Sequence, residues 1–146
     1  MSDRESKENC TFCKILSKEY QSSEIYRDDK VAAFLDIQPV NSGHVLVIPI
    51  EHSPYLEDLN PDTGAHIFKV AQKISKAIRK SGIKCEAINM LLADGEEAGQ
   101  EVWHTHLHLF PRFSNDGFGF KFSNEYFNKP DRNELDQVAE KIREQL

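Results

Sequence analysis

The chain has 146 residues, of which 39% are hydrophobic and 29% charged, and a formal net charge of -6. This composition fits one globular domain that buries roughly two thirds of its unfolded surface. The negative charge argues against long nucleic acids as partners, and no apolar run reaches the roughly 20 residues of a membrane-spanning helix. The polar start differs from a secretory signal, and three cysteines suit a reducing cytosol. We therefore expect a cytoplasmic protein with a flexible tail over residues 1–9 and a single domain over residues 10–146.

Apolar periodicity and turn-forming residues divide the chain into strands and helices. Strands are predicted where β-branched and apolar residues gather between turn signals, and helices where apolar residues recur every three or four positions. In chain order, the predicted elements are a short helix over 14–18, strands over 24–27, 31–35 and 44–49, a helix from 61 to about 80, strands over 86–92 and 104–110, and a helix from about 131. The fold class is therefore α+β, with an antiparallel sheet and helices packed on one face.

The long helix has the clearest predicted boundaries. Asn60 is typical of an N-cap and Pro61 of the first helical position. Ser81-Gly82 is typical of a helix end with a left-handed cap. The apolar face that would cover the sheet consists of Ile67, Val70, Ala71, Ile74 and Ile78.

Three of the six histidines alternate with Thr105 and Leu107 in one short stretch. A strand places alternate side chains on one face, about 7 Å apart, so His104, His106 and His108 would form a row of imidazoles. Such a row has three interpretations: an exposed polar run, a metal site built from all three imidazoles, or catalysis on an anionic group. The interleaved apolar residues disfavour the first.

Two cysteines have the spacing of a zinc site. Cys10 and Cys13 lie three positions apart, which lets two thiolates reach one tetrahedral ion. No strand precedes them, which disfavours a redox pair, although cysteines without a metal remain an alternative. His52, just after the strand over 44–49, and His104 are the candidate further ligands. A structural Zn²⁺ bound by these four residues would leave His106 and His108 available for chemistry. Cys85 has no such partner and is expected to be a small apolar residue that fills space beside a strand.

Several segments together resemble the histidine triad (HIT) family, and most of all its bacterial zinc-containing, Hint-like branch. The histidine row matches the His-φ-His-φ-His-φ-φ motif, where φ is apolar, although Thr105 is only partly so. The other matching segments, in family order, are Cys10-x-x-Cys13-Lys14-Ile15, residues 33–37, residues 43–49 and residues 98–102. The resemblance spans residues 10–113. It implies a HIT-like fold with about five antiparallel strands, a long helix and a C-terminal helix packed on them, and a homodimer joined through about residues 61–92.

The resemblance also implies roles for individual residues. His106 would attack the α-phosphorus of a nucleotide and form a nucleotidyl-histidine, with the carbonyl of His104 fixing its tautomer. His108 would contact the same phosphate as a donor or a proton carrier, and Gln100 with the backbone at Gly99 would stabilise the phosphoryl oxygens. The further nucleotide-binding candidates are Asp36 for the ribose, Asn89 for phosphate or sugar, and Ile15, Phe34 and Ile37 for a purine base.

Some of these residues have plainer alternatives. Asp36 could cap the loop after its strand, and Asn89 could be an ordinary sheet residue. Phe34 and Ile37 could belong to the core, as strand residues often do. His44 is expected beneath the triad as a hydrogen-bonding partner or as a plain strand residue, and His66 is expected to be merely exposed.

The resemblance indicates a hydrolase that acts on purine nucleoside phosphoramidates, acyl-nucleotides or dinucleoside polyphosphates. Glu101 stands where some Hint-like proteins have a serine that protonates the leaving group, and a carboxylate would need a raised pKa for that role. Retention of the third histidine favours hydrolysis over transfer to a sugar phosphate. Two alternatives are a nucleotide-binding regulatory module with incidental hydrolysis and a metal-binding protein that uses the whole triad.

Overall fold

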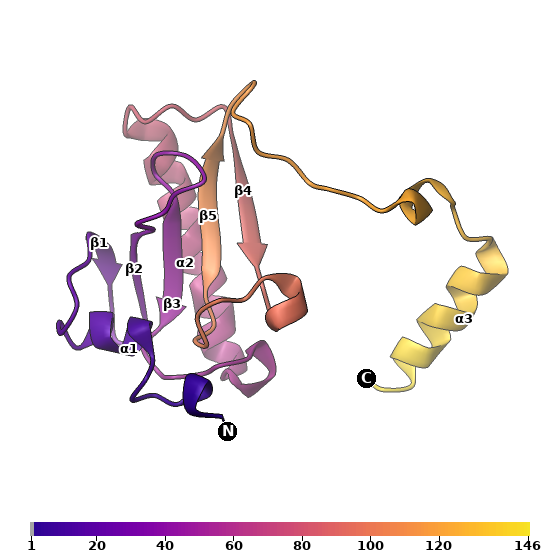
Figure 1. Cartoon of the computed structure of the whole chain (residues 1–146), viewed down its shortest axis with the longest axis horizontal. Helices are drawn as coiled ribbons and strands as arrows, with labels where there is room; N and C mark the ends of the chain where they lie inside the picture. The colour runs from indigo at the N-terminus through magenta and orange to yellow at the C-terminus, as the bar shows by residue number, and fades with distance from the viewer. Residues whose placement is uncertain (1) are drawn as a thin grey trace. The chain divides into compact units, whose positions relative to one another are not determined.

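A computed structural model describes residues 2–146, and its internal contacts divide the chain into two units, one ending at Asp116 and the other spanning Gly117–Leu146. Five antiparallel strands form the centre of the first unit in the order β1-β2-β3-β5-β4 (Figure 1). The strands are β1 Glu24–Arg27, β2 Val31–Leu35, β3 Val45–Pro49, β4 Ala87–Leu92 and β5 Leu107–Arg112. The predicted five-stranded antiparallel α+β fold is thus confirmed.

Two helices of the first unit cover opposite faces of the sheet, whereas the sequence predicted helices on one face. Helix α2, Pro61–Lys80, packs against β2, β3 and β5, and its buried residues join the larger of two apolar clusters. Helix α1, Thr11–Leu16, contributes Phe12 to the smaller cluster, which lies against Phe34 and Leu46. Because β2 and β3 are buried on both faces, their sequences are continuous apolar runs rather than alternating ones.

The boundaries of α2 follow the sequence prediction. The Asn60 side chain accepts a hydrogen bond from the Asp62 N–H at 2.9 Å, and Pro61 is the first helical residue. At the other end, the Ser81 hydroxyl donates to the carbonyl of Ile78, and Gly82 follows with a φ of +85°. These local signals therefore placed the helix correctly because each acts through neighbouring backbone groups.

The histidine row begins before its strand rather than within it. Strand β5 starts at Leu107, so His104 and His106 lie in the irregular segment that leads into it. Thr105 causes this departure, because both its N–H and its hydroxyl donate to the carbonyl of Ser53, at 2.7 and 2.9 Å. The prediction of one strand carrying all three imidazoles was wrong, and the three rings face different partners.

The two ends of the chain also contain regular structure, a short turn near the start and a helix near the end. Within residues 1–9, Asp3–Glu5 form a 3-10 turn that contacts other parts of the first unit. Helix α3, Arg132–Arg143, lies in the second unit, and its apolar residues Leu135, Val138 and Ile142 are exposed. Packing of this helix on a sheet stays a prediction. None of the helices described is long and apolar enough to cross a membrane.

Candidate nucleotide and metal site

The cysteines and two histidines converge on one point between α1, β3 and β5. Cys10 is the N-cap of α1, and its Sγ lies 3.3 Å from Nδ1 of His104. Cys13 Sγ lies 3.4 Å from Nδ1 of His52 and 3.6 Å from Nδ1 of His104. Tetrahedral zinc requires sulfur–nitrogen separations of about 3.5 Å, from Zn–S and Zn–N lengths of about 2.3 and 2.0 Å. The donor set predicted from the sequence is therefore assembled with spacings that suit zinc.

Both histidines of this cluster present a lone pair to the sulfur atoms. The carbonyl of Pro49 accepts from Nε2 of His104 at 2.8 Å, and the carbonyl of Glu5 accepts from Nε2 of His52 at 2.7 Å. A neutral imidazole has one N–H, so Nδ1 is the lone-pair atom in each ring. Burial lowers the pKa of His104 to about 4. Burial, and then its hydrogen bond with Cys10, raise the pKa of Cys13 to about 12. The imidazole of His104 is thus neutral, and a bound cation would displace the proton of the Cys13 thiol.

His106 has the geometry of a nucleophile. Its Nδ1 donates to the carbonyl of His104 at 2.7 Å, so Nε2 carries the lone pair. The ring of Phe12 contacts it edge-on, with centroids 5.0 Å apart, and limits its rotation. Burial lowers its pKa from the ordinary histidine value, which keeps the imidazole neutral near pH 7. The carbonyl partner is the one that the family resemblance implied.

His108 is oriented by His44, which lies on the neighbouring strand end. The Val40 N–H donates to Nδ1 of His44 at 3.0 Å, so the proton of this ring is on Nε2. That Nε2–H donates to Nδ1 of His108 at 2.9 Å, which places the proton of His108 on its own Nε2. Burial lowers the pKa of both rings, that of His108 to about 4. His44 is thus the hydrogen-bonding partner that was expected beneath the triad.

A second group of possible metal ligands includes Asp36 with this histidine pair. Asp36, His44 and His108 place three donor atoms within 4.8 Å of one another. The Nε2 of His44 carries a proton in the tautomer set by Val40, so this atom has no lone pair for an ion. Because His104 faces the cysteines and His108 faces His44, a single metal site built from the whole triad does not fit this geometry.

Gln100 holds the glycine loop that precedes the histidines. Its Oε1 accepts from the Gly95 N–H at 2.8 Å, and its Nε2 donates to the carbonyls of Pro54 and Val102 at 2.7 and 3.1 Å. The side chain is buried, and both amide hydrogens are occupied by these carbonyls. Gly99, with a φ of +90°, caps the turn Glu96–Ala98. The contacts observed for Gln100 therefore shape the loop, and a contact with phosphate stays a prediction.

Asp36 lies where a strand end, a loop and an open pocket meet. One of its oxygens accepts from the Gln38 N–H at 2.9 Å, and the other lies 3.6 Å from Nε2 of His44. Its capping role in the loop is thus observed. Phe34 is buried against Phe12, with ring centroids 5.4 Å apart, whereas the side chain of Ile37 is 98% exposed. Phe34 therefore belongs to the core.

The pocket beside Asp36 adds residues to which the sequence assigned no role in the site. Its volume is about 650 Å³, and Asp36 and Ile37 line one side of it. Ile15 is partly buried against the smaller apolar cluster, which contains Phe12, and it is not among the residues that line this pocket. The pocket residues missed by sequence reasoning are Lys18, Tyr20, Gln21, Ser22, Ser23 and Leu35. All but Leu35, the last residue of β2, lie in the irregular segment between α1 and β1, so only the fold brings them to Asp36.

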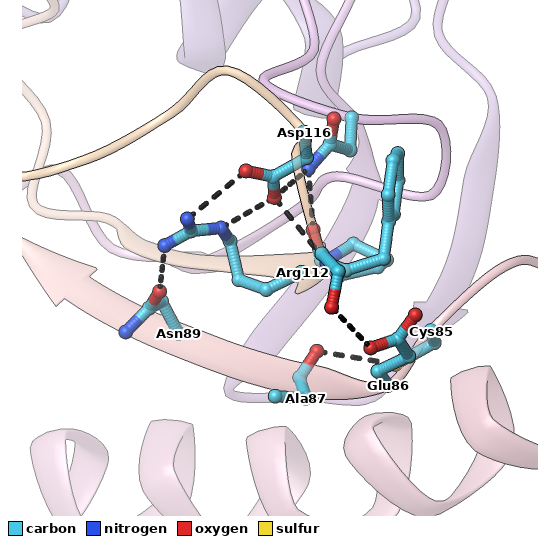
Figure 2. A network of polar contacts seen from close by, with 10 residues as sticks. Cys85, Glu86, Ala87, Asn89, Arg112 and Asp116 are labelled. Atoms are coloured by element: carbon cyan, nitrogen blue, oxygen red, sulfur yellow. Dashed lines mark hydrogen bonds and ion pairs between the residues drawn. The ribbon is translucent and has the colours of Figure 1, made fainter.

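Asn89 belongs to a different polar network. Its Oδ1 accepts from Arg112 Nη1 at 2.7 Å, and Arg112 also binds Asp116 through Nε at 2.6 Å (Figure 2). Asn41 donates to the same carboxylate at 2.9 Å. In the sheet, Asn89 pairs with Phe110, whereas Leu91 stands opposite His108. The structure therefore brings Asn89 to Arg112 rather than to the histidines, and its nucleotide role stays a prediction.

Comparisons with known proteins agree with this architecture. The model of the HIT domain matches residues 17–115. An uncharacterised HIT-like protein of Borreliella burgdorferi is 49% identical, with 80% of this chain and 85% of that protein covered. The adenosine 5'-monophosphoramidase HNT1 of Candida albicans is 33% identical, with 94% and 91% covered.

Solved structures of similar proteins have the same fold. A HIT family protein from Bacillus anthracis superposes with a TM-score of 0.85 and 42% identity, covering 94% of this chain and 97% of that chain. A zinc-bound histidine triad family protein from Mycobacterium smegmatis has a TM-score of 0.74 and 36% identity, covering 92% and 99%.

Proposed function

Because the chain belongs to the HIT family, we propose that it hydrolyses purine nucleotides at the α-phosphorus through a covalent nucleotidyl-His106 intermediate. The substrate class is nucleoside phosphoramidates, acyl-nucleotides or dinucleoside polyphosphates. The observation that carries this proposal is the 2.7 Å hydrogen bond from His106 Nδ1–H to the carbonyl of His104, which leaves the lone pair of this buried, neutral ring on Nε2 as the nucleophile. The similarity to a protein named adenosine 5'-monophosphoramidase supports the phosphoramidate class.

The reaction proceeds in two displacements. The Nε2 lone pair of His106 attacks the α-phosphorus, a phosphorus–nitrogen bond forms, and the bond to the leaving group breaks. The leaving group takes up a proton as it departs. Water then attacks the same phosphorus, the His106–phosphorus bond breaks, and the proton lost by this water balances the one taken up before. The products are a nucleoside monophosphate, the protonated leaving group and the original imidazole.

The surrounding residues orient the phosphate and the nucleoside. His108 offers Nε2–H to a phosphoryl oxygen, since His44 occupies its Nδ1. The backbone of the glycine loop, held by Gln100, lies next to the histidine segment in sequence and would approach the same oxygens. Asp36 would bind the ribose hydroxyls through the oxygen that faces His44, with the base in the pocket lined by Tyr20 and Ile37.

Zinc is the metal that best fits the cysteine–histidine cluster. Two sulfur and two nitrogen donors, and sulfur–nitrogen separations of 3.3 to 3.6 Å, suit a closed structural zinc site. Cys10, Cys13, His52 and His104 would hold the ion, which would fasten α1 to His104 and so steady the carbonyl partner of His106. The zinc-bound relative from Mycobacterium smegmatis supports this assignment.

The covalent mechanism is tested by replacing the nucleophile. His106→Ala should lower turnover of adenosine 5'-phosphoramidate by at least about 10³-fold, because removal of a covalent nucleophile costs more than loss of a binding contact. Intact mass spectrometry of acid-quenched wild type should show a nucleotidyl adduct that the variant lacks. His66→Ala is the matched control, since His66 lies on α2 and binds Asp28. Retained turnover in His106→Ala would overturn the mechanism, and nucleotide binding without turnover in wild type would favour the regulatory module.

We also propose that the protein is a cytoplasmic homodimer. The apolar side chains of Phe68 on α2 and Met90 in the edge strand β4 are 55% and 36% exposed, within the region 61–92 that the family resemblance implies as the interface. Exposed apolar groups at a sheet edge favour a partner.

A further inference from the structure

The N-terminal turn Asp3–Glu5 binds the segments that carry the zinc ligands. The backbone carbonyl of Glu5 accepts a hydrogen bond from Nε2 of His52. The side-chain carboxylate of Glu5 accepts one from the hydroxyl of Tyr55 at 2.5 Å. The guanidinium of Arg4 lies 4.4 Å above the ring of Trp103, the residue before His104. No residue of this turn is buried, so polar contacts rather than apolar packing hold it in place.

The turn is also closed by its own hydrogen bonds. The Ser2 N–H donates to the Glu5 carboxylate at 2.9 Å, and the Asn9 side chain donates to the carbonyl of Asp3 at 2.9 Å. Arg4 additionally pairs with Glu96 at 3.2 Å, in the turn before Gln100. The carbonyl that faces His52 is thus part of a small ordered unit rather than a loose chain end.

The two zinc-ligating histidines differ in what orients them. His104 is fully buried and donates to Pro49, a residue of the central strand β3. His52 is only half-buried, and its Nε2–H donates to the N-terminal turn. Loss of the acceptor would free the His52 ring to rotate or to exchange tautomers, so that Nδ1 would no longer face Cys13. Partners of this kind typically change metal affinity by about 10- to 100-fold.

We propose that the N-terminal turn is a positioning element of the zinc site: Glu5, anchored by Tyr55, fixes His52 in its ligating orientation and slows zinc release. The inference rests on the zinc assignment and is independent of the covalent chemistry at His106. It gives the first residues of the chain a role in metal retention, beyond that of a tail.

The proposal is tested by measuring zinc release from the full-length protein to an excess of a chromogenic chelator. Deletion of residues 2–6 removes the carbonyl acceptor and should accelerate release by about 10- to 100-fold. Tyr55→Phe removes only the hydroxyl that anchors Glu5 and should accelerate release several-fold, with the fold intact. Glu8→Gln is the matched control within the same exposed segment and should release zinc at the wild-type rate.

A cobalt-substituted protein separates positioning from general destabilisation. In the wild type, the visible absorption of Co²⁺ should report two sulfur and two nitrogen ligands in a tetrahedral site. In the deletion variant, the bands should shift as water replaces His52, while circular dichroism stays unchanged. Equal release rates in wild type and both variants, unchanged cobalt spectra, or a wild type that takes up no zinc would each overturn the proposal. None of these results would affect the test of His106.

Discussion

At the scale of single residues, hydrogen-bond partners decide what each histidine can do. His106 and His108 are only two positions apart, yet one presents a lone pair from Nε2 and the other an N–H from Nε2. The difference arises because His106 donates to a carbonyl, whereas His108 accepts from His44. A sequence motif specifies the residue types, but these protonation states depend on neighbours distant in the chain.

This arrangement predicts a specific role for His44. His44→Ala should lower the single-turnover rate by about 10²-fold, because His108 loses the donor that keeps its own proton on Nε2. His44→Gln should recover part of the rate, since its amide can donate to the same nitrogen. Nitrogen-15 NMR of the histidine rings should show His108 changing tautomer in His44→Ala only. Equal rates in the two variants would contradict this role.

A second residue-scale prediction concerns Asp28. Its carboxylate accepts from His66 at 2.6 Å, from the Tyr26 hydroxyl at 2.7 Å and from the N–H groups of Lys30 and Val31 at 2.8 Å. These four hydrogen bonds outweigh its desolvation, which acts in the opposite direction, and hold its pKa well below the ordinary aspartate value. His66, expected to be merely exposed, is therefore a partner in a link between α2 and the β1–β2 turn.

The lowered pKa determines how stability should depend on pH. A carboxyl whose pKa is lower in the folded state contributes stability above its unfolded pKa of about 3.9 and loses it as the pH falls further. Asp28→Asn should therefore reduce the free energy of unfolding by about 2 kcal/mol at pH 6, and the difference from wild type should shrink below about pH 4. Urea titrations across this range measure it, with Asp29→Asn as the control. A difference that grows on acidification would contradict the assignment.

At the scale of elements, sequence prediction succeeded where the signals are local. Helix α2 begins and ends at the predicted residues because Asn60, Pro61 and Gly82 act on adjacent backbone groups. The start of β5 was misplaced because Thr105 binds the carbonyl of Ser53, which is 52 positions away. The cysteine half of the candidate metal cluster was predicted because cysteine spacing is a local signal, whereas the pocket beside Asp36 exists only in the folded chain.

Helix α1 yields an element-scale prediction. With six residues it is too short to be stable alone, so it depends on the packing of Phe12 and, under the zinc proposal, on the metal that Cys10 and Cys13 would hold. Cys13→Ala should abolish stoichiometric zinc binding and lower the melting temperature by about 3 °C for each kcal/mol lost. Cys85→Ala should retain one zinc per chain, because Cys85 lies outside the cluster. Metal analysis and calorimetry distinguish the two, and unchanged zinc in Cys13→Ala would rule out this ligand set.

At the scale of the whole molecule, a second copy of the chain would bury surface that the isolated chain exposes. Strand β4 is an edge of the sheet, and its Met90 pairs with Leu109, whose side chain belongs to the α2 side of the core. Phe68 is exposed on α2 itself, which packs on that same side. Edge strands with exposed apolar groups tend to pair or associate unless something covers them.

If the proposed dimer forms through this surface, the double variant Phe68→Glu, Met90→Glu should be a monomer at micromolar concentration, because two buried carboxylates without partners would oppose association. Sedimentation velocity measures the mass directly. Leu56→Glu is the matched control, since Leu56 is similarly exposed, at 45%, but lies in the turn Leu56–Asp58 outside α2 and β4. A dimer that survives the double substitution would place the interface elsewhere on the chain, and a wild type that stays monomeric at all concentrations would contradict the dimer itself.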